Sequence, residues 1–137
     1  EPYYYRLITN VHSMSATNLT SRRYMELYTY LPAAIIKNPK NALLIGFGCG
    51  TTAKAITDVQ NFEHIDIVDI SKDIVNMSQV VFSDKNENPI YDSRTKIHIE
   101  DGRFFLLSSK KQYDLITAEP PPPRNNKIAN LDISFKV

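Results

Sequence analysis

The sequence predicts an α/β fold built on a parallel sheet, and three observations carry this prediction. Apolar runs of strand length alternate with helical patterns along most of the 137 residues. Three alternate glycines, Gly46, Gly48 and Gly50, directly follow the first apolar run of this alternation. An acid, Asp69, ends the next run. Strand, glycine turn, helix, strand and acid in this order are typical of a βαβ unit that binds a ligand at the carboxyl ends of its strands.

The composition is that of an ordinary globular chain, with 42% apolar and 23% charged residues. The net charge of +1 gives no reason to expect nucleic acid or an anionic membrane as a partner. A single cysteine, Cys49, excludes an internal disulfide and a multi-cysteine metal site, and no metal is expected. No apolar run approaches the ~18 residues of a membrane span, and no signal-peptide pattern precedes Glu1. We therefore expect a cytoplasmic chain without a membrane part.

Residues 1–37 are expected to form an N-terminal extension of one strand and one helix. The aromatic run Tyr3–Ile8 is interpreted as a core strand, and a lid that folds over a ligand is the alternative. Residues 10–18 contain turn formers and are interpreted as a loop. The helix is expected to begin at Thr20-Ser21 and to continue to residue 36. Its predicted apolar face follows helical spacing and consists of Tyr24, Leu27, Tyr28 and Leu31.

Residues 38–137 are expected to form the nucleoside-binding domain. The predicted strands are 42–45, 65–69, 95–99 and 114–118, and the predicted helices are 51–59, 72–82 and 103–108. Right-handed crossovers between parallel strands then give the order 3-2-1-4, with the first strand inside the sheet. The carboxyl ends of these strands share one edge, where the glycine turn, Asp69, Asp101-Gly102 and Glu119 converge.

Each part of this edge has a chemical reason to bind a nucleoside. Glycines allow the backbone to turn sharply and to approach a ligand closely, since they carry no Cβ. The helix that follows directs its free N–H groups toward the turn. An acid at the tip of the second strand can accept both hydroxyls of a ribose. The G-x-G-x-G spacing differs from the dinucleotide pattern G-x-G-x-x-G and is typical of S-adenosylmethionine-type ligands. A structural glycine turn, with Asp69 merely exposed at a strand end, is the alternative.

Five segments resemble the nucleoside-binding half of spermidine synthase-like proteins, within the class I S-adenosylmethionine-dependent methyltransferase fold. These segments are Leu-Pro-Ala-Ala at 31–34, Asn-Pro-Lys-Asn-Ala-Leu-Leu-Ile-Gly-Phe-Gly-Cys-Gly at 38–50, His-Ile-Asp-Ile-Val-Asp-Ile-Ser at 64–71, Asp-Gly-Arg-Phe-Phe-Leu at 101–106 and Tyr-Asp-Leu-Ile-Thr-Ala-Glu-Pro at 113–120. The resemblance implies a Rossmann-like parallel sheet that is C-terminally truncated, because complete sheets of this type continue beyond the fourth strand. The ending Glu119–Pro123 is similar to a bacterial subgroup fused to a transporter-like membrane part.

The resemblance also implies roles for individual residues. Decarboxylated S-adenosylmethionine, or S-adenosylmethionine itself, is the implied co-substrate. Residues implied to contact it are Gly46, Gly48 and Gly50 at the sulfonium and ribose, Asp69 at the ribose hydroxyls with Ile70 beside it, and Asp101 at the adenine amino group with Gly102 beside it. Tyr24 and Glu26 match a tyrosine-x-glutamate pair on the entry helix and are implied to face a small amine substrate.

Two departures from the family pattern leave the reaction open. Aminopropyltransferases carry an acid in the glycine turn, where this chain has Cys49. They carry Asp-Ser-x-Asp-Pro after the fourth strand, where this chain has Glu119 followed by four prolines, with Pro122 at the second acid. Glu119 is therefore the one candidate for the carboxylate that takes the proton of the attacking amine.

Three functions follow from these observations. The first is a transferase that moves an aminopropyl group to a small amine, and the second is an S-adenosylmethionine-dependent methyltransferase. The third is a binding module that retains the nucleoside site without turnover. A catalytic thiol at Cys49 has no clear histidine or asparagine partner. The fourth strand would end the sheet, and such an edge favours association, so a homo-oligomer is a possible assembly.

Overall fold

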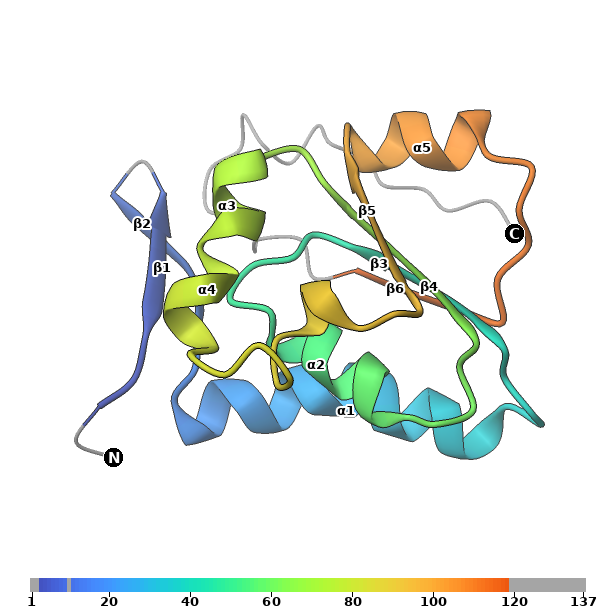
Figure 1. Cartoon of the computed structure of the whole chain (residues 1–137), viewed down its shortest axis with the longest axis horizontal. Coiled ribbons are helices and arrows are strands. Elements are labelled where there is room, and N and C mark those ends of the chain that lie inside the picture. The colour runs from blue at the N-terminus through green and yellow to red at the C-terminus, as the bar shows by residue number, and fades with distance from the viewer. Residues whose placement is uncertain (1–2, 10, 119–137) are drawn as a thin grey trace, which may run out of the picture.

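A four-stranded parallel sheet forms the centre of the computed structural model, which describes residues 3–9 and 11–118 (Figure 1). Its strands lie in the order β5 (Thr95–Ile99), β4 (His64–Asp69), β3 (Asn41–Ile45) and β6 (Leu115–Ala118). All three neighbouring pairs are parallel. The predicted order 3-2-1-4 is therefore confirmed, with the first predicted strand in the interior of the sheet.

Helices lie on both faces of the sheet, as Figure 1 shows: α1 (Leu19–Ile35) and α2 (Thr51–Asp58) on one face, and α5 (Gly102–Ser108) on the other. Successive residues of β3 belong to different cores. Ala42 and Leu44 pack in the larger core, which includes residues of α2, whereas Leu43 packs with Phe105 of α5. Burial on both sides explains why this strand is an uninterrupted apolar run instead of an alternating one.

The N-terminal segment differs from its prediction because it forms an antiparallel hairpin, β1 (Arg6–Thr9) with β2 (His12–Ala16). The interpretation of the tyrosine run as a core strand is wrong, since Tyr3, Tyr4 and Tyr5 precede β1 and are 91%, 45% and 48% exposed. The hairpin buries Leu7 and Ala16 instead. Residues 12–16 carry few β-branched or aromatic side chains, so propensity did not indicate a strand there.

The hairpin turn contains a strained residue, Val11, which has φ 68° and is 95% exposed. A β-branched side chain in the left-handed region costs roughly 1–2 kcal/mol, and a glycine at this position would avoid that cost. The glycine would lose about 0.5–1 kcal/mol of this gain, because it has more conformational entropy to lose on folding. We therefore expect Val11→Gly to stabilise the hairpin modestly, which hydrogen exchange of the bonded Thr17 amide would show as slower exchange. Val11→Ala is the control, because it removes the branch but keeps the Cβ and the strain. Equal protection in both variants would contradict this explanation.

Helix α1 begins one residue before its predicted start and retains Pro32 inside it, but the predicted apolar face is wrong. Tyr24, Leu27, Tyr28 and Leu31 are 41–59% exposed together with Tyr30 of the same helix. The buried residues are Met25 and Thr29, and Ala33 and Ile36 continue this line against the core. The helix carries two apolar stripes, and periodicity alone does not distinguish which of them meets the sheet.

The helix predicted over 72–82 is two short helices, α3 (Lys72–Asn76) and α4 (Ser78–Val81). Ser71 caps α3, since its hydroxyl accepts the Ile74 N–H. The break coincides with a buried polar contact in which Asn88 Nδ2 donates to the hydroxyl of Ser78 at 3.2 Å. A short 3₁₀ helix, η1 (Pro89–Tyr91), lies between α4 and β5.

Arg94, which directly precedes β5, closes the end of α2. Its guanidinium donates to the carbonyls of Thr57, Val59 and Phe62, with distances of 3.1 and 3.0 Å to the last two, and pairs with Asp92 at 2.7 Å. Thr57 lies in the last turn of α2, where carbonyls have no partner within the helix, and Val59 and Phe62 follow the helix. One side chain therefore terminates α2 and attaches it to the neighbouring strand.

Candidate functional site

The glycine turn joins the carboxyl end of β3 to the first residue of α2. It is held internally by the Gly50 N–H, which donates to the carbonyl of Phe47 at 2.9 Å, and to the sheet by the Gly46 N–H, which donates to Val68 at 2.8 Å. Gly46, Gly48 and Gly50 have φ 87°, 56° and 81°, a region that other residues rarely adopt. A Cβ at Gly46 would meet nothing within 4 Å, so the backbone there faces open space that a ligand can approach.

Asp69 is part of this turn and is not an exposed acid at a strand end. Its residue is 7% exposed, and its carboxylate accepts the Phe47 N–H at 2.7 Å and the Ser71 N–H at 2.8 Å. An ionised carboxylate can accept about four hydrogen bonds, so two acceptor positions remain. The two hydrogen bonds fix the orientation of the carboxylate against the glycine turn.

The hairpin is fastened to the same turn by a contact that the sequence did not indicate. The Ser15 hydroxyl accepts the Cys49 N–H at 3.0 Å and donates to the Cys49 sulfur at 3.1 Å. A Cβ on Gly48 would come within 3.0 Å of this hydroxyl oxygen. The N-terminal hairpin therefore packs on the glycine turn, and whether it covers a ligand stays a prediction. Cys49 is buried and engaged with Ser15, which argues against a reactive thiol.

The end of β5 meets the same edge. The Glu100 N–H donates to the Asp69 carbonyl at 3.1 Å, which places Asp101 next in the chain. The exposed carboxylate of Asp101 caps α5 by accepting the Phe104 N–H at 2.9 Å. A Cβ on Gly102 would lie 2.4 Å from the Ile45 Cγ2 atom, so a glycine is needed there for packing, whatever it contributes to a ligand.

The remaining predicted site residues are Ile70, Tyr24, Glu26 and Glu119. Ile70 is 73% exposed immediately after Asp69, at the surface of the edge. Tyr24 is 42% exposed on α1, where its ring lies edge-on to Tyr28 with centroids 6.2 Å apart. Glu26 forms an ion pair with Arg22 at 3.6 Å. Among the ion pairs of the described residues, Glu26 contacts a residue of its own helix and not the glycine turn. The predicted catalytic residue, Glu119, lies outside the described residues.

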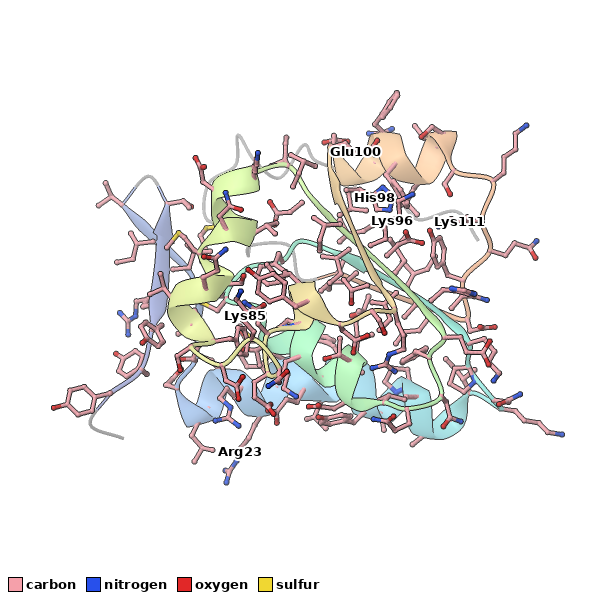
Figure 2. The ribbon with its side chains drawn as sticks, in the orientation of Figure 1. Arg23, Lys85, Lys96, His98, Glu100 and Lys111 are labelled. Atoms are coloured by element: carbon pink, nitrogen blue, oxygen red, sulfur yellow. The ribbon has the colours of Figure 1, made fainter. Side chains whose placement is uncertain are left out.

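A charged cluster centred on the buried Asp66 carboxylate lies on the face of the sheet that α5 covers, since its member His98 packs against Phe105 of α5; Figure 2 labels two of its members, His98 and Lys111. Asp66 of β4 has a side chain only 3% exposed and accepts from His98 Nε2 at 2.6 Å, Lys111 Nζ at 2.7 Å and the Tyr113 hydroxyl at 3.0 Å. Burial acts to raise the pKa of Asp66, but these three partners outweigh it and leave the pKa below its ordinary value. The cluster attaches the connection before β6 to β4 and β5.

Residues 3–9 and 11–118 contain no group of three or more His, Cys, Asp and Glu side chains suited to a metal ion. In the same part of the chain, no helix combines the length and the apolar character that crossing a membrane requires.

Comparison with known families matches residues 21–134 to the spermine/spermidine synthase domain. A polyamine aminopropyltransferase of Lachnoclostridium phytofermentans is 32% identical over 124 residues, which are 90% of this chain and 44% of that protein. The chain thus spans less than half the length of this curated relative.

Solved structures agree on the fold. The spermidine synthase of Thermotoga maritima superposes with a TM-score of 0.70 at 20% identity, over 83% of this chain and 38% of the other. A spermidine synthase in complex with the transition-state analogue AdoDATO gives a TM-score of 0.68 at 20% identity, over 80% and 38% of the two chains. The Rossmann-like class I methyltransferase fold predicted from the sequence is therefore confirmed.

Proposed function

Because the chain belongs to the spermine/spermidine synthase domain family, we propose that it is the nucleoside-binding part of an aminopropyltransferase. Its co-substrate is decarboxylated S-adenosylmethionine, and its acceptor is a small aliphatic amine. This proposal extends the activity that the names of the relatives state for those proteins to a chain that matches less than half of their length.

One observation supports the proposed nucleoside site. The Asp69 carboxylate accepts an N–H of the glycine turn, and the backbone at Gly46 faces open space. The two remaining acceptor positions of Asp69 bind the ribose hydroxyls, and Gly46, Gly48 and Gly50 allow the ligand to approach the backbone. Ile70 provides an apolar surface beside the ribose. Asp101 accepts from the adenine amino group, with Gly102 beside it, and Tyr24 and Glu26 lie toward the amine.

The proposed reaction is a single displacement. The amine nitrogen attacks the aminopropyl carbon bonded to the sulfonium sulfur, a C–N bond forms, and the C–S bond breaks with its electron pair left on sulfur. Methylthioadenosine leaves, and the attacking nitrogen loses one proton. Glu119 is the proposed acceptor of that proton. Alignment of the two reactants supplies much of the remaining acceleration.

A second function is favoured by one sequence feature, the proline at position 122 in place of the second acid of the family motif. A chain with one acid in this motif can retain the nucleoside and lose turnover. Such a binding module would use the same glycine turn and the same Asp69.

The test measures binding and product in the same preparation. Calorimetry with decarboxylated S-adenosylmethionine is expected to show saturable binding, and incubation with putrescine is expected to release methylthioadenosine. Glu119→Gln should reduce the release and leave the affinity unchanged. Binding without product from any amine would establish the module instead. Release of S-adenosylhomocysteine from S-adenosylmethionine would establish methyl transfer.

A further inference from the structure

We propose that Ser15 makes the nucleoside site selective for nucleosides without a phosphate on the 5′ carbon. Ser15 lies on β2 of the N-terminal hairpin, and its hydroxyl bonds to the N–H and to the sulfur of Cys49 in the glycine turn. This selectivity rests on the proposed function, because it is a property of the same site. The hairpin thereby takes part in the choice of ligand, in addition to its packing on the turn.

Glycine turns bind phosphate through free backbone N–H groups of the turn and of the helix that follows. In this chain, most of these groups in the turn have acceptors within the protein. The Gly46 N–H donates to the Val68 carbonyl at 2.8 Å. The Gly50 N–H donates to the Phe47 carbonyl at 2.9 Å, and the Phe47 N–H donates to the Asp69 carboxylate at 2.7 Å. Formation of the turn therefore uses three donors that a phosphate would require.

The Cys49 N–H is satisfied by the hairpin and not by the turn or the sheet. The Ser15 hydroxyl accepts this N–H at 3.0 Å and donates its own proton to the Cys49 sulfur at 3.1 Å. Among residues 3–9 and 11–118, the N–H of the neighbouring Gly48 has no acceptor. Without Ser15, two successive N–H groups would be free, which is the arrangement of a backbone nest for an anion. Ser15 therefore closes a turn that could otherwise bind phosphate.

The hydroxyl also fills the space above the turn. A Cβ on Gly48 would come within 3.0 Å of the Ser15 oxygen, and a Cβ on Gly50 would come within 2.8 Å of two phenylalanine rings. Gly50 is the N-cap of α2, so these rings stand at the helix end where an anion would otherwise be favoured. Gly46, in contrast, faces open space. A ligand therefore reaches the turn at Gly46 and finds no group of free donors beyond it.

The chemistry of the hydroxyl favours one class of 5′ substituent. Ser15 gives its proton to Cys49, so only its lone pairs remain for a ligand. A phosphate oxygen is also an acceptor, and placing its charge against the hydroxyl costs desolvation without a compensating hydrogen bond. A thioether carries no charge, and a sulfonium carries a positive charge that favours contact with lone pairs. The site therefore accepts 5′-thio nucleosides and rejects nucleotides.

Calorimetric titration with adenosine, 5′-methylthioadenosine and adenosine 5′-monophosphate measures this selectivity, and methylthioadenosine controls for bulk at the 5′ carbon. The unaltered chain should bind the monophosphate about ten-fold more weakly than methylthioadenosine, which corresponds to one missing hydrogen bond to a charged group. Ser15→Gly frees the Cys49 N–H and the space above Gly48. The monophosphate should then gain about ten-fold in affinity relative to methylthioadenosine.

Two control variants separate this role from support of the fold. Ser15→Thr keeps the hydroxyl and should keep the selectivity. Ser13→Gly removes a hydroxyl from an exposed residue of the same strand and should leave the ratio of the affinities unchanged. Nuclear magnetic resonance adds a direct readout, because the Cys49 amide signal of Ser15→Gly should shift with the monophosphate and not with methylthioadenosine.

Equal affinities for the monophosphate and methylthioadenosine in the unaltered chain would overturn the proposal. Equal losses for all three ligands in Ser15→Gly would make Ser15 a support of the turn only, and the same gain in Ser13→Gly would assign it to a loosened hairpin. Absence of adenosine binding would contradict both the selectivity and the nucleoside site. Adenosine binding without selectivity contradicts the role of Ser15 alone, whereas selectivity without release of methylthioadenosine in the putrescine assay contradicts the proposed transfer alone.

Discussion

Replacing Asp66 with alanine is expected to lower the free energy of unfolding by about 3 kcal/mol, the lower end of the cost of breaking a buried ion pair. The carboxylate holds three donors from β5 and from the connection before β6, and its side chain is 3% exposed. Lys111 is 54% exposed and can return its ammonium to water, whereas His98 and Tyr113 would lose their acceptor in a part-buried site. Urea denaturation would measure the change.

The surface pair Lys40–Glu63 provides the control for Asp66. Glu63 also accepts from a lysine, but its side chain is 58% exposed. Glu63→Ala is expected to change the stability by less than about 1 kcal/mol. Similar losses of stability in Asp66→Ala and Glu63→Ala would show that the burial of Asp66 does not increase its contribution to the free energy of unfolding.

The same cluster makes the stability depend on pH at both extremes. The folded pKa of Asp66 is below its ordinary value of 3.8, so its contribution is present above that pH and is lost as the pH falls through the folded value. Burial and the Asp66 carboxylate raise the pKa of Tyr113 to about 12 from an ordinary 10.0, so its contribution is complete below pH 10.0 and is lost as the pH rises toward 12. Tyr113→Phe should therefore reduce the alkaline dependence of stability, and Asp66→Ala should reduce the acid dependence and also lessen the alkaline one.

Asp69→Ala is expected to weaken adenosine binding roughly ten- to a hundred-fold for each ribose hydrogen bond lost, because such bonds to a charged group contribute about 1.5–3 kcal/mol. The variant also removes the acceptor of the Phe47 and Ser71 N–H groups, so the glycine turn loses its anchor. Calorimetric titration with adenosine and with adenine separates the two effects. A ribose role predicts a loss for adenosine and little change for adenine.

Asp73→Ala is the matched control, since it removes an equally charged, exposed acid from the first turn of α3, four residues further along the chain. Its adenosine affinity should stay within two-fold of the unaltered chain. Equal losses for adenine and adenosine in Asp69→Ala would assign the effect to the turn and contradict direct contact with the ribose. A loss in Asp73→Ala as large as that in Asp69→Ala would indicate a general charge effect.

The sequence by itself determined the sheet and the edge at which the glycine turn and Asp69 meet. The strand order follows from apolar runs that alternate with helical patterns. The glycine turn follows from three alternate glycines, which the structure places at φ values that other residues rarely adopt. These signals are local, since each depends on spacing within a few residues. Asp69 was located in the same way, at the end of an apolar run.

Only the tertiary structure decided which surfaces of those elements are used. Helix α1 has two apolar stripes, and contact with α2 and the core buries Met25 and Thr29 instead of Tyr24 and Leu27. Asp66 lies on β4, and Lys111 lies far from it in the chain, in the connection before β6. The two side chains meet only because the sheet places β4 beside β5 and two strands from β6. Such contacts depend on residues distant in sequence, and no periodicity within one segment records them.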